Sequence, residues 1–171
     1  MEAMDAILSR RSIRKYTSDS IPETVINELL EAAMSAPSSN NQQPWHFVII
    51  NDRVILDEIP NFHPYSNMLK EASLAIAVCG DLQLEKSRGT WFLDCSAATE
   101  NILIAAQAKG LGAVWLGIYP REERIRGLQD LLALPQHVIP LSLVSIGYPA
   151  EEKPRVNRYN ASRICYNQWH S

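Results

Sequence analysis

The sequence predicts an α+β domain, in which helices and strands share one hydrophobic core. A chain of 171 residues with 46% hydrophobic residues is long enough to bury most of its apolar surface as one domain. The continuous apolar run at 74–79 ends at a Gly-Asp pair and is typical of a strand buried on both faces. Residues 91–109 are small or apolar on nearly every side, which predicts a helix that is buried on most sides. We therefore expect a single domain over residues 1–171, with strand 74–79 at the centre of its sheet.

The first half of the chain begins with two predicted helices. Apolar residues recur at helical spacing in residues 4–8, which predicts a short helix that ends at a basic cluster. Pro22 suits the first position of a second helix, and Pro37 stops it. The other elements expected here are a strand at 45–50, a short helix at 54–59 and a helical turn at 68–72.

The second half continues the alternation of helices and strands. Gly110 is placed to cap the C-terminus of the long helix. The elements expected after it are a strand at 113–119, a helix at 121–132 and a strand at 141–146. Residues 150–171 have no clear period but retain aromatic and apolar side chains, which predicts an extended C-terminal arm that lies across some surface.

Composition argues against several classes of function. The net charge of -3 and the absence of a second basic stripe argue against nucleic-acid binding. The first residues lack a basic region followed by an apolar run, and prolines interrupt the uncharged stretch 131–150, so we expect a cytoplasmic protein without membrane spans. Three widely spaced cysteines and four histidines show neither a C-x-x-C pair nor metal-ligand spacing, so no disulfide framework or metal site is expected.

A cluster of cations at 10–15 is the first candidate binding site. Four of the sixteen Lys and Arg residues lie in these six positions, around Ser12. Guanidinium forks beside a hydroxyl suit a phosphate dianion. Alternatively, the cations complement the dipole of the preceding helix and otherwise face water. On this segment alone, both interpretations stay open.

A second candidate is the polar loop at 37–44, which has no large apolar side chain and is rich in hydroxyl and amide groups. It suits either an ordinary surface connection or a binding loop. The Gly-Leu-Gly at 110–112 follows a helix and precedes a strand, so it is not a dinucleotide-binding fingerprint. No P-loop, G-x-S-x-G or H-E-x-x-H occurs, so side-chain catalysis has no evident site.

Four motifs in this order resemble the FMN-dependent nitroreductase family along essentially the entire chain. They are R-R-S-x-R at 10–14, P-S-S-x-N-x-Q-P-W at 37–45, the segment 94–101 and G-L-G-A-V-W at 110–115. The first two at this separation are specific together, although either alone is weak. The resemblance implies a central, mainly antiparallel sheet flanked by helices, in an intertwined homodimer that binds FMN at the subunit interface.

The resemblance also implies which residues bind FMN. The phosphate would be bound by Arg10, Ser12 and Arg14, with Lys153 or Arg155 returning to it from the arm, and the ribityl chain would lie near Arg11. Those that reach the flavin from the other subunit would be Pro37, Ser38, Ser39 and Asn41. The backbone of Trp115, Leu116 and Gly117 would lie beside the flavin ring, with one amide facing its N5.

The implied activity is a two-step electron transfer. NAD(P)H reduces FMN and leaves, and a small oxidised acceptor, such as a nitroaromatic or a quinone, then takes the place of NAD(P)H. Other flavin reactions on this scaffold, such as reductive dehalogenation or dehydrogenation, remain open, as does non-catalytic FMN binding or sensing. Longer relatives place Asn and Lys side chains at the pyrimidine edge of the flavin, where this chain has Tyr65, Ser66, Asn67 and Met68. The stretch 119–140 is also too short for the inserted helices that cover the active site of longer members.

Overall fold

The fold is built on a four-stranded antiparallel sheet, seen in a computed structural model that describes residues 1–169. The strands are β1 (Trp45–Ile50), β2 (Leu74–Asp81), β3 (Gly112–Gly117) and β4 (Val138–Gly147). Their order across the sheet is β1-β2-β4-β3, and every neighbouring pair is antiparallel. The mainly antiparallel sheet that the resemblance implied is therefore confirmed.

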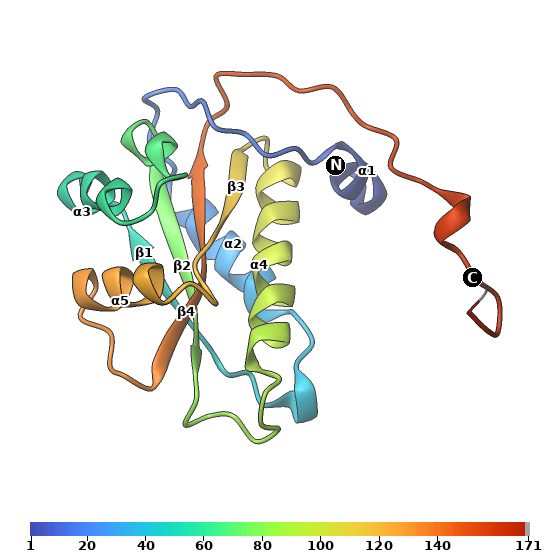
Figure 1. The fold of residues 1–171 in the computed structure, drawn as a ribbon. Helices are drawn as coiled ribbons and strands as arrows, with labels where there is room; N and C mark the ends of the chain where they lie inside the picture. The colour runs from blue at the N-terminus through green and yellow to red at the C-terminus, as the bar shows by residue number, and fades with distance from the viewer. Residues whose placement is uncertain (170–171) are drawn as a thin grey trace.

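Helices cover both faces of this sheet (Figure 1). They are α1 (Ala3–Ser9), α2 (Glu23–Met34), α3 (Arg53–Glu58), α4 (Trp91–Ala108) and α5 (Glu122–Leu131). One hydrophobic cluster joins α2 and α4 to the sheet, and a second joins α3 and α5 to its other face. The expected α+β class is thus confirmed, and every helix and strand expected from the sequence is present, apart from a few residues at the ends.

The two inner strands form the centre of the core. All eight residues of β2 are buried, as its continuous apolar run predicted. The ten residues of β4 extend beyond the predicted 141–146 at both ends. The extension passes through Pro140, opposite a register shift between Val78 and Cys79 of β2. Such a local irregularity lets a sheet accommodate a proline, which has no N–H to donate.

The basic segment at 10–15 is attached to the start of β3, which is an edge strand. Ser12 and Ala113 form a parallel bridge, and the Ile13 N–H donates to the Ala113 carbonyl at 3.0 Å. A Cβ added to Gly112 would lie 2.6 Å from the Ile13 side chain, so only glycine allows this close approach. The buried Tyr16 hydroxyl also donates to the Ile13 carbonyl at 2.8 Å. These contacts hold the cations beside the sheet.

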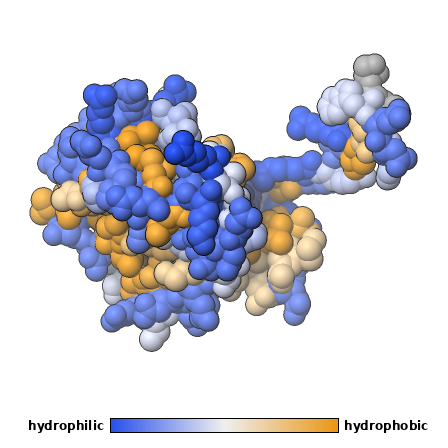
Figure 2. All heavy atoms as spheres, turned by 90° about the horizontal axis from the view of Figure 1, so that it is seen from below, coloured by the Kyte–Doolittle hydropathy of each residue, from blue (hydrophilic) through white to orange (hydrophobic). Residues whose placement is uncertain are grey.

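Two segments expose apolar side chains at the surface. The predicted apolar stripe of α1 is exposed, since Met4, Ile7 and Leu8 are exposed by 62%, 48% and 42%. Residues 150–169 leave the body as an extended arm that ends far from the sheet (Figures 1 and 2), and its aromatic side chains are exposed. The last two positions of the predicted arm, 170–171, lie outside the described residues. In the part of the chain that the structure describes, no helix is both long and apolar enough to cross a membrane.

Candidate functional site

The basic segment lies against the first residues of the C-terminal arm. Lys153 donates from Nζ to the Ser12 carbonyl at 2.7 Å, across 141 positions of sequence. The Arg11 guanidinium donates to the carbonyl of Pro154. The fold therefore brings together Ser12 and Lys153, which the resemblance placed at the phosphate, and Arg11, which it placed near the ribityl chain.

Glu151 lies within this cluster of cations, and sequence reasoning gave it no role. Its Oε1 accepts the Arg14 backbone N–H at 2.6 Å and lies 3.1 Å from Lys153 Nζ. The hydrogen bond from the Arg14 amide, with a smaller contribution from Lys153, lowers the pKa of this carboxyl below its ordinary value. Glu151 thus stays ionised and orders the crossing of the two segments.

The other predicted cations occupy different surroundings. Arg10 pairs with Glu100 of α4 at 3.4 Å. Arg155 lies farther along the arm and lines a small cavity with Ile7 and Leu8 of α1, rather than the phosphate cluster. The Arg14 side chain is exposed and forms no ion pair with any residue from 1 to 169. Within the basic segment, Arg14 is therefore the predicted site cation most available to an external anion.

A cavity of about 250 Å³ opens beside the basic segment. Arg11, Glu151 and Lys153 line it, together with Gln107 and Gly110 at the C-terminal end of α4. The cavity therefore lies between the predicted phosphate cations and one end of the long helix.

The polar loop is held at the opposite end of the same helix by a buried carboxylate. Asp94 is 4% exposed and accepts the Ser39 N–H at 2.9 Å. Its second oxygen accepts Gln42 Nε2 at 2.6 Å. Gln42 is itself buried, and its Oε1 accepts the backbone N–H groups of Lys86 and Ser87 at 2.8 and 2.9 Å. Every polar atom of the Gln42 side chain thus has a partner.

This network fixes an unusual backbone. Asn40, Asn41 and Gln43 all have positive φ, at 51°, 49° and 46°. Non-glycine residues seldom adopt this region, and asparagine tolerates it better than most. The asparagines and the buried Asp94 together therefore give Pro37, Ser38, Ser39 and Asn41 one defined arrangement.

Within one chain, the loop and the basic segment are far apart. The loop contacts Asp94, whereas Ser9, which immediately precedes the basic segment, accepts Gln107 Nε2 at 3.2 Å. At a rise of about 1.5 Å per residue, Asp94 and Gln107 are roughly 20 Å apart along α4. Of the basic segment, the side chain of Arg10 reaches back along α4 as far as Glu100. A single chain does not bring the two predicted halves of the site together.

The third predicted part of the site is the outer edge of β3. Hydrogen bonds of an antiparallel strand alternate between its two sides. The Ile118 N–H bonds to β4 at 3.1 Å, whereas the Ala113 carbonyl bonds to Ile13 on the other side. Trp115 and Gly117 alternate with the residues that bond to β4, as Ala113 does, so their backbone N–H and C=O groups point to the outer edge. The backbone groups of Leu116 point to β4 instead, so Leu116 does not contribute to this edge.

Gly117 provides open space at this edge. It is exposed, and no atom of the described chain lies within 4 Å of a Cβ built on it. A glycine inside a strand often marks close approach of a ligand or of another backbone. A flat group could therefore lie directly against this backbone.

The sequence motifs did not identify the residues that contact the Gly117 carbonyl. This carbonyl accepts His63 Nε2 at 3.1 Å and Arg124 Nη1 at 2.8 Å. Arg124 also lies over the exposed ring of Tyr65, with its Cζ 5.6 Å from the centroid. Tyr65 belongs to the segment that the sequence marked as different from longer relatives. No local pattern marked His63 or Arg124, because only the fold places them beside Gly117.

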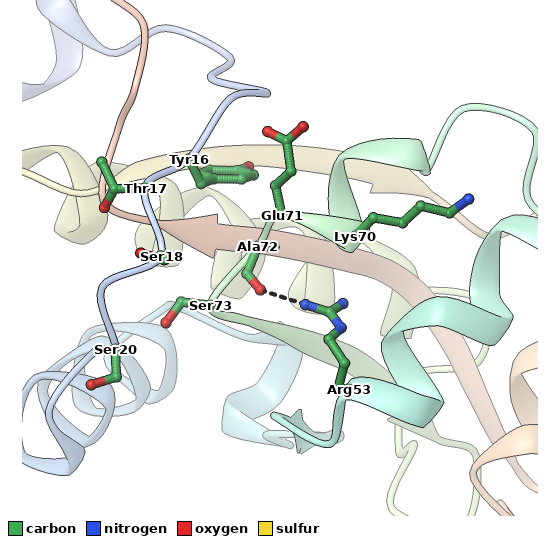
Figure 3. A pocket seen from close by; sticks show the side chains of 9 residues that line it. All are labelled: Tyr16, Thr17, Ser18, Ser20, Arg53, Lys70, Glu71, Ala72 and Ser73. Carbon is green, nitrogen blue, oxygen red and sulfur yellow. Dashed lines mark hydrogen bonds between the residues drawn. The ribbon is translucent and has the colours of Figure 1, made fainter.

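A larger cavity of about 410 Å³ contains none of the predicted site residues (Figure 3). Arg53 lines it, but its guanidinium donates to the Ala72 carbonyl at 3.1 Å and pairs with Asp57 at 3.1 Å. The guanidinium of Arg53, the most strongly basic group of this cavity, therefore already has partners within the chain.

Two of the three cysteines are unsuited to nucleophilic chemistry. Burial raises the pKa of Cys79 to about 12 and raises that of Cys95 further, so both remain thiols near neutral pH. The described residues contain no group of three or more His, Cys, Asp or Glu side chains that could hold a metal ion.

Comparison with known proteins identifies the family. The profile of the "Nitroreductase family" matches residues 7–148, which is most of the chain. The chain belongs to the nitroreductase family. A nitroreductase-family relative from Methanothermobacter thermautotrophicus is 47% identical over 169 residues, covering 99% of this chain and 88% of its own. The "NADH dehydrogenase" of Thermus thermophilus is 30% identical, covering 96% and 95%.

Solved structures agree with this assignment. A crystal structure from Parabacteroides distasonis has a TM-score of 0.94 and 43% identity, and the match covers 98% of both chains. A nitroreductase structure from Desulfovibrio desulfuricans, determined in complex with FMN, has a TM-score of 0.85 and 30% identity over 99% of both chains. The fold of this chain is thus that of the nitroreductase family over at least 98% of its length.

Proposed function

We propose that this chain is an FMN-dependent oxidoreductase that uses NAD(P)H to reduce a small oxidised acceptor, such as a nitroaromatic or a quinone, in two steps. The observation that carries the proposal is the open edge of β3, where Gly117 presents its backbone N–H and free space beside it. The FMN in the Desulfovibrio desulfuricans structure and the name of the Thermus thermophilus relative support the cofactor and the reductant.

The residues of the chain suit the two ends of FMN. Arg14 and Arg11 can bind the phosphate dianion with Ser12 and Lys153, because guanidinium forks match phosphate oxygens. The backbone edge at Trp115 and Gly117 suits a flat ring with hydrogen-bonding groups on its rim. Arg10 and Arg155 have other surroundings, so we assign the phosphate chiefly to Arg11, Arg14 and Lys153.

The protein contributes positioning and electrostatics to the reaction. FMN, when bound, supplies the redox chemistry, since it accepts a hydride from NAD(P)H and passes two electrons to an acceptor. With FMN bound, the outward N–H of Gly117 would be a donor to the ring, on which negative charge develops during reduction. Neither Cys79 nor Cys95 can serve as a thiolate there, because burial raises the pKa of both. We assign no ionisable side chain to the transfer itself.

The experiment that tests this function begins with the purified protein. A yellow protein that releases FMN on denaturation, and whose flavin absorbance bleaches when NAD(P)H is added without oxygen, is expected. A screen of nitroaromatic, quinone and halogenated acceptors then separates nitroreduction from the other flavin reactions. Bound FMN that NAD(P)H does not bleach would favour an FMN-binding or sensing protein, and absence of FMN binding would overturn the proposal.

Arg14→Ala is expected to weaken FMN binding. Losing one charged partner of a phosphate costs about 1.5–3 kcal/mol, or roughly ten- to hundredfold in Kd. Titration of the FMN-free protein with FMN, followed by flavin fluorescence, measures this. Arg126→Ala removes the same charge from a surface pair with Glu122 and serves as the control. Equal FMN affinity in the two variants would contradict the phosphate assignment.

We further propose a homodimer in which each FMN site takes the basic segment of one copy and the polar loop of the other. Its support is the separation of these segments along α4, together with the exposed arm and the exposed apolar side chains of α1. An obligate interface of this kind buries more than about 2,000 Å². Sedimentation at micromolar concentration should therefore give a dimer, and an FMN-loaded monomer would exclude it.

A mixed dimer tests whether the sites are shared. One copy carries Arg14→Ala and the other Asp94→Ala, which releases the polar loop. With shared sites, the mixed dimer has one intact site and should bind one FMN tightly, whereas each altered homodimer binds none tightly. If each site lay within one chain, the mixed dimer would also lack a tight site.

A further inference from the structure

The carbonyl of Gly117 accepts two hydrogen bonds from outside the sheet. His63, between the 3-10 turns Ile59–Asn61 and Asn67–Lys70, donates from Nε2 at 3.1 Å. Arg124, in the first turns of α5, donates from Nη1 at 2.8 Å. Three segments separate in sequence thus meet at one backbone oxygen on the open edge of β3.

The surroundings of His63 determine which ring nitrogen carries the proton. Its side chain is buried, and Nδ1 accepts the Tyr65 backbone N–H at 3.3 Å. Nδ1 is therefore the unprotonated nitrogen, and Nε2–H donates to Gly117. Burial, and then the charge of Arg124, lower the pKa of His63, so its neutral form is favoured. The His63 carbonyl in turn accepts the buried Ser66 hydroxyl at 2.7 Å, which holds the turn in place.

Gly117 requires such support because of its position. Glycine has more backbone freedom than any other residue, and among residues 1–169 no strand pairs with the outer side of β3 at Gly117. The peptide that follows Gly117 is held by β4 on one side only, where the Ile118 N–H donates to the Leu141 carbonyl at 3.1 Å. The donors on the Gly117 carbonyl hold the other side of that peptide, and they thereby limit the backbone rotation at Gly117 on which the direction of its N–H depends.

We propose that His63 and Arg124 are positioning residues that hold Gly117 so that its N–H points to the flavin, and that they thereby set FMN affinity and redox potential. This inference rests on the proposed FMN site. The two residues contact a backbone carbonyl, and neither transfers a proton or an electron. Arg124 additionally places a positive charge near the edge where negative charge develops, which favours the reduced cofactor over the oxidised one.

The test compares variants that remove or retain the donor. His63→Leu removes the Nε2 donor, whereas His63→Gln offers an amide N–H at a similar reach. Arg124→Met removes the guanidinium and keeps an unbranched stem over Tyr65. Arg126→Met, on the same helix, and His46→Gln, beside Asp81 on the opposite edge strand β1, are the matched controls. FMN affinity and the midpoint potential of bound FMN are measured for each.

We expect His63→Leu and Arg124→Met to weaken binding of oxidised FMN about fivefold and of reduced FMN about fiftyfold. The tenfold difference lowers the midpoint potential by about 30 mV, the value of one decade for two electrons. His63→Gln should recover most of both effects. If His63→Leu does not fold, Arg124→Met alone tests the proposal. The Arg124 side chain is partly exposed, so its replacement should leave the fold intact.

Unchanged affinity and potential in Arg124→Met and His63→Leu, with only a lower melting temperature, would overturn the inference and leave a structural role. Failure of the proposed function would look different, because in that case the unaltered protein would bind no FMN at all.

Discussion

Gly117→Val is expected to weaken FMN binding about a hundredfold while leaving the FMN-free fold intact. A Cβ on Gly117 meets no atom within 4 Å, so the substitution adds no clash inside the chain. Its backbone lies outside the left-handed φ range, so valine introduces no strain there. The added methyl groups would occupy the space that we assign to the flavin ring, and a hundredfold in Kd corresponds to about 2.7 kcal/mol.

FMN titration and thermal unfolding of the FMN-free protein measure the two sides of this prediction. Gly117→Ala adds one methyl group and should give a smaller loss of affinity. Equal affinity in Gly117→Val and the unaltered protein would show that nothing lies against this edge, and the flavin site would have to be elsewhere.

Asp94→Ala is expected to lower the free energy of unfolding by about 2–3 kcal/mol, since it leaves buried donors without partners. The carboxylate accepts the Ser39 N–H and Gln42 Nε2, at 2.9 and 2.6 Å, and is 4% exposed. Gln42 retains only its bond to Thr90 on that side, at 2.9 Å. The polar loop should lose its single arrangement as well, and FMN affinity should fall with it.

Urea unfolding at constant m-value measures the change in stability. Asp94→Asn keeps one acceptor oxygen, so its loss should be about half as large. Asp130→Ala, which removes an exposed carboxylate at the end of α5, is the control and should stay within about 0.5 kcal/mol. A similar stability for Asp94→Ala and Asp130→Ala would show that the buried network does not stabilise the loop.

Local patterns in the sequence determined the elements of the fold. The apolar run of β2 and the nearly all-apolar helix α4 were predictable because burial on several sides shows directly in consecutive residues. Chain direction and pairing are not local, so the antiparallel sheet came from the family resemblance. The strand β4 was predicted too short, because Pro140 interrupts the pattern. The sheet accommodates this proline through a register shift in which Leu141 is an extra residue of β4 opposite Val78 and Cys79.

The parts of the site also divide into those with a local pattern in the sequence and those that depend on contacts between distant segments. The basic segment and the polar loop carry their chemistry in consecutive residues, so the sequence alone marked both. Glu151, His63 and Arg124 belong to no motif and gain a role only through neighbours far along the chain. The structure also placed the two marked segments at opposite ends of α4. Distances across a fold depend on how elements pack, and no spacing in the sequence encodes that packing.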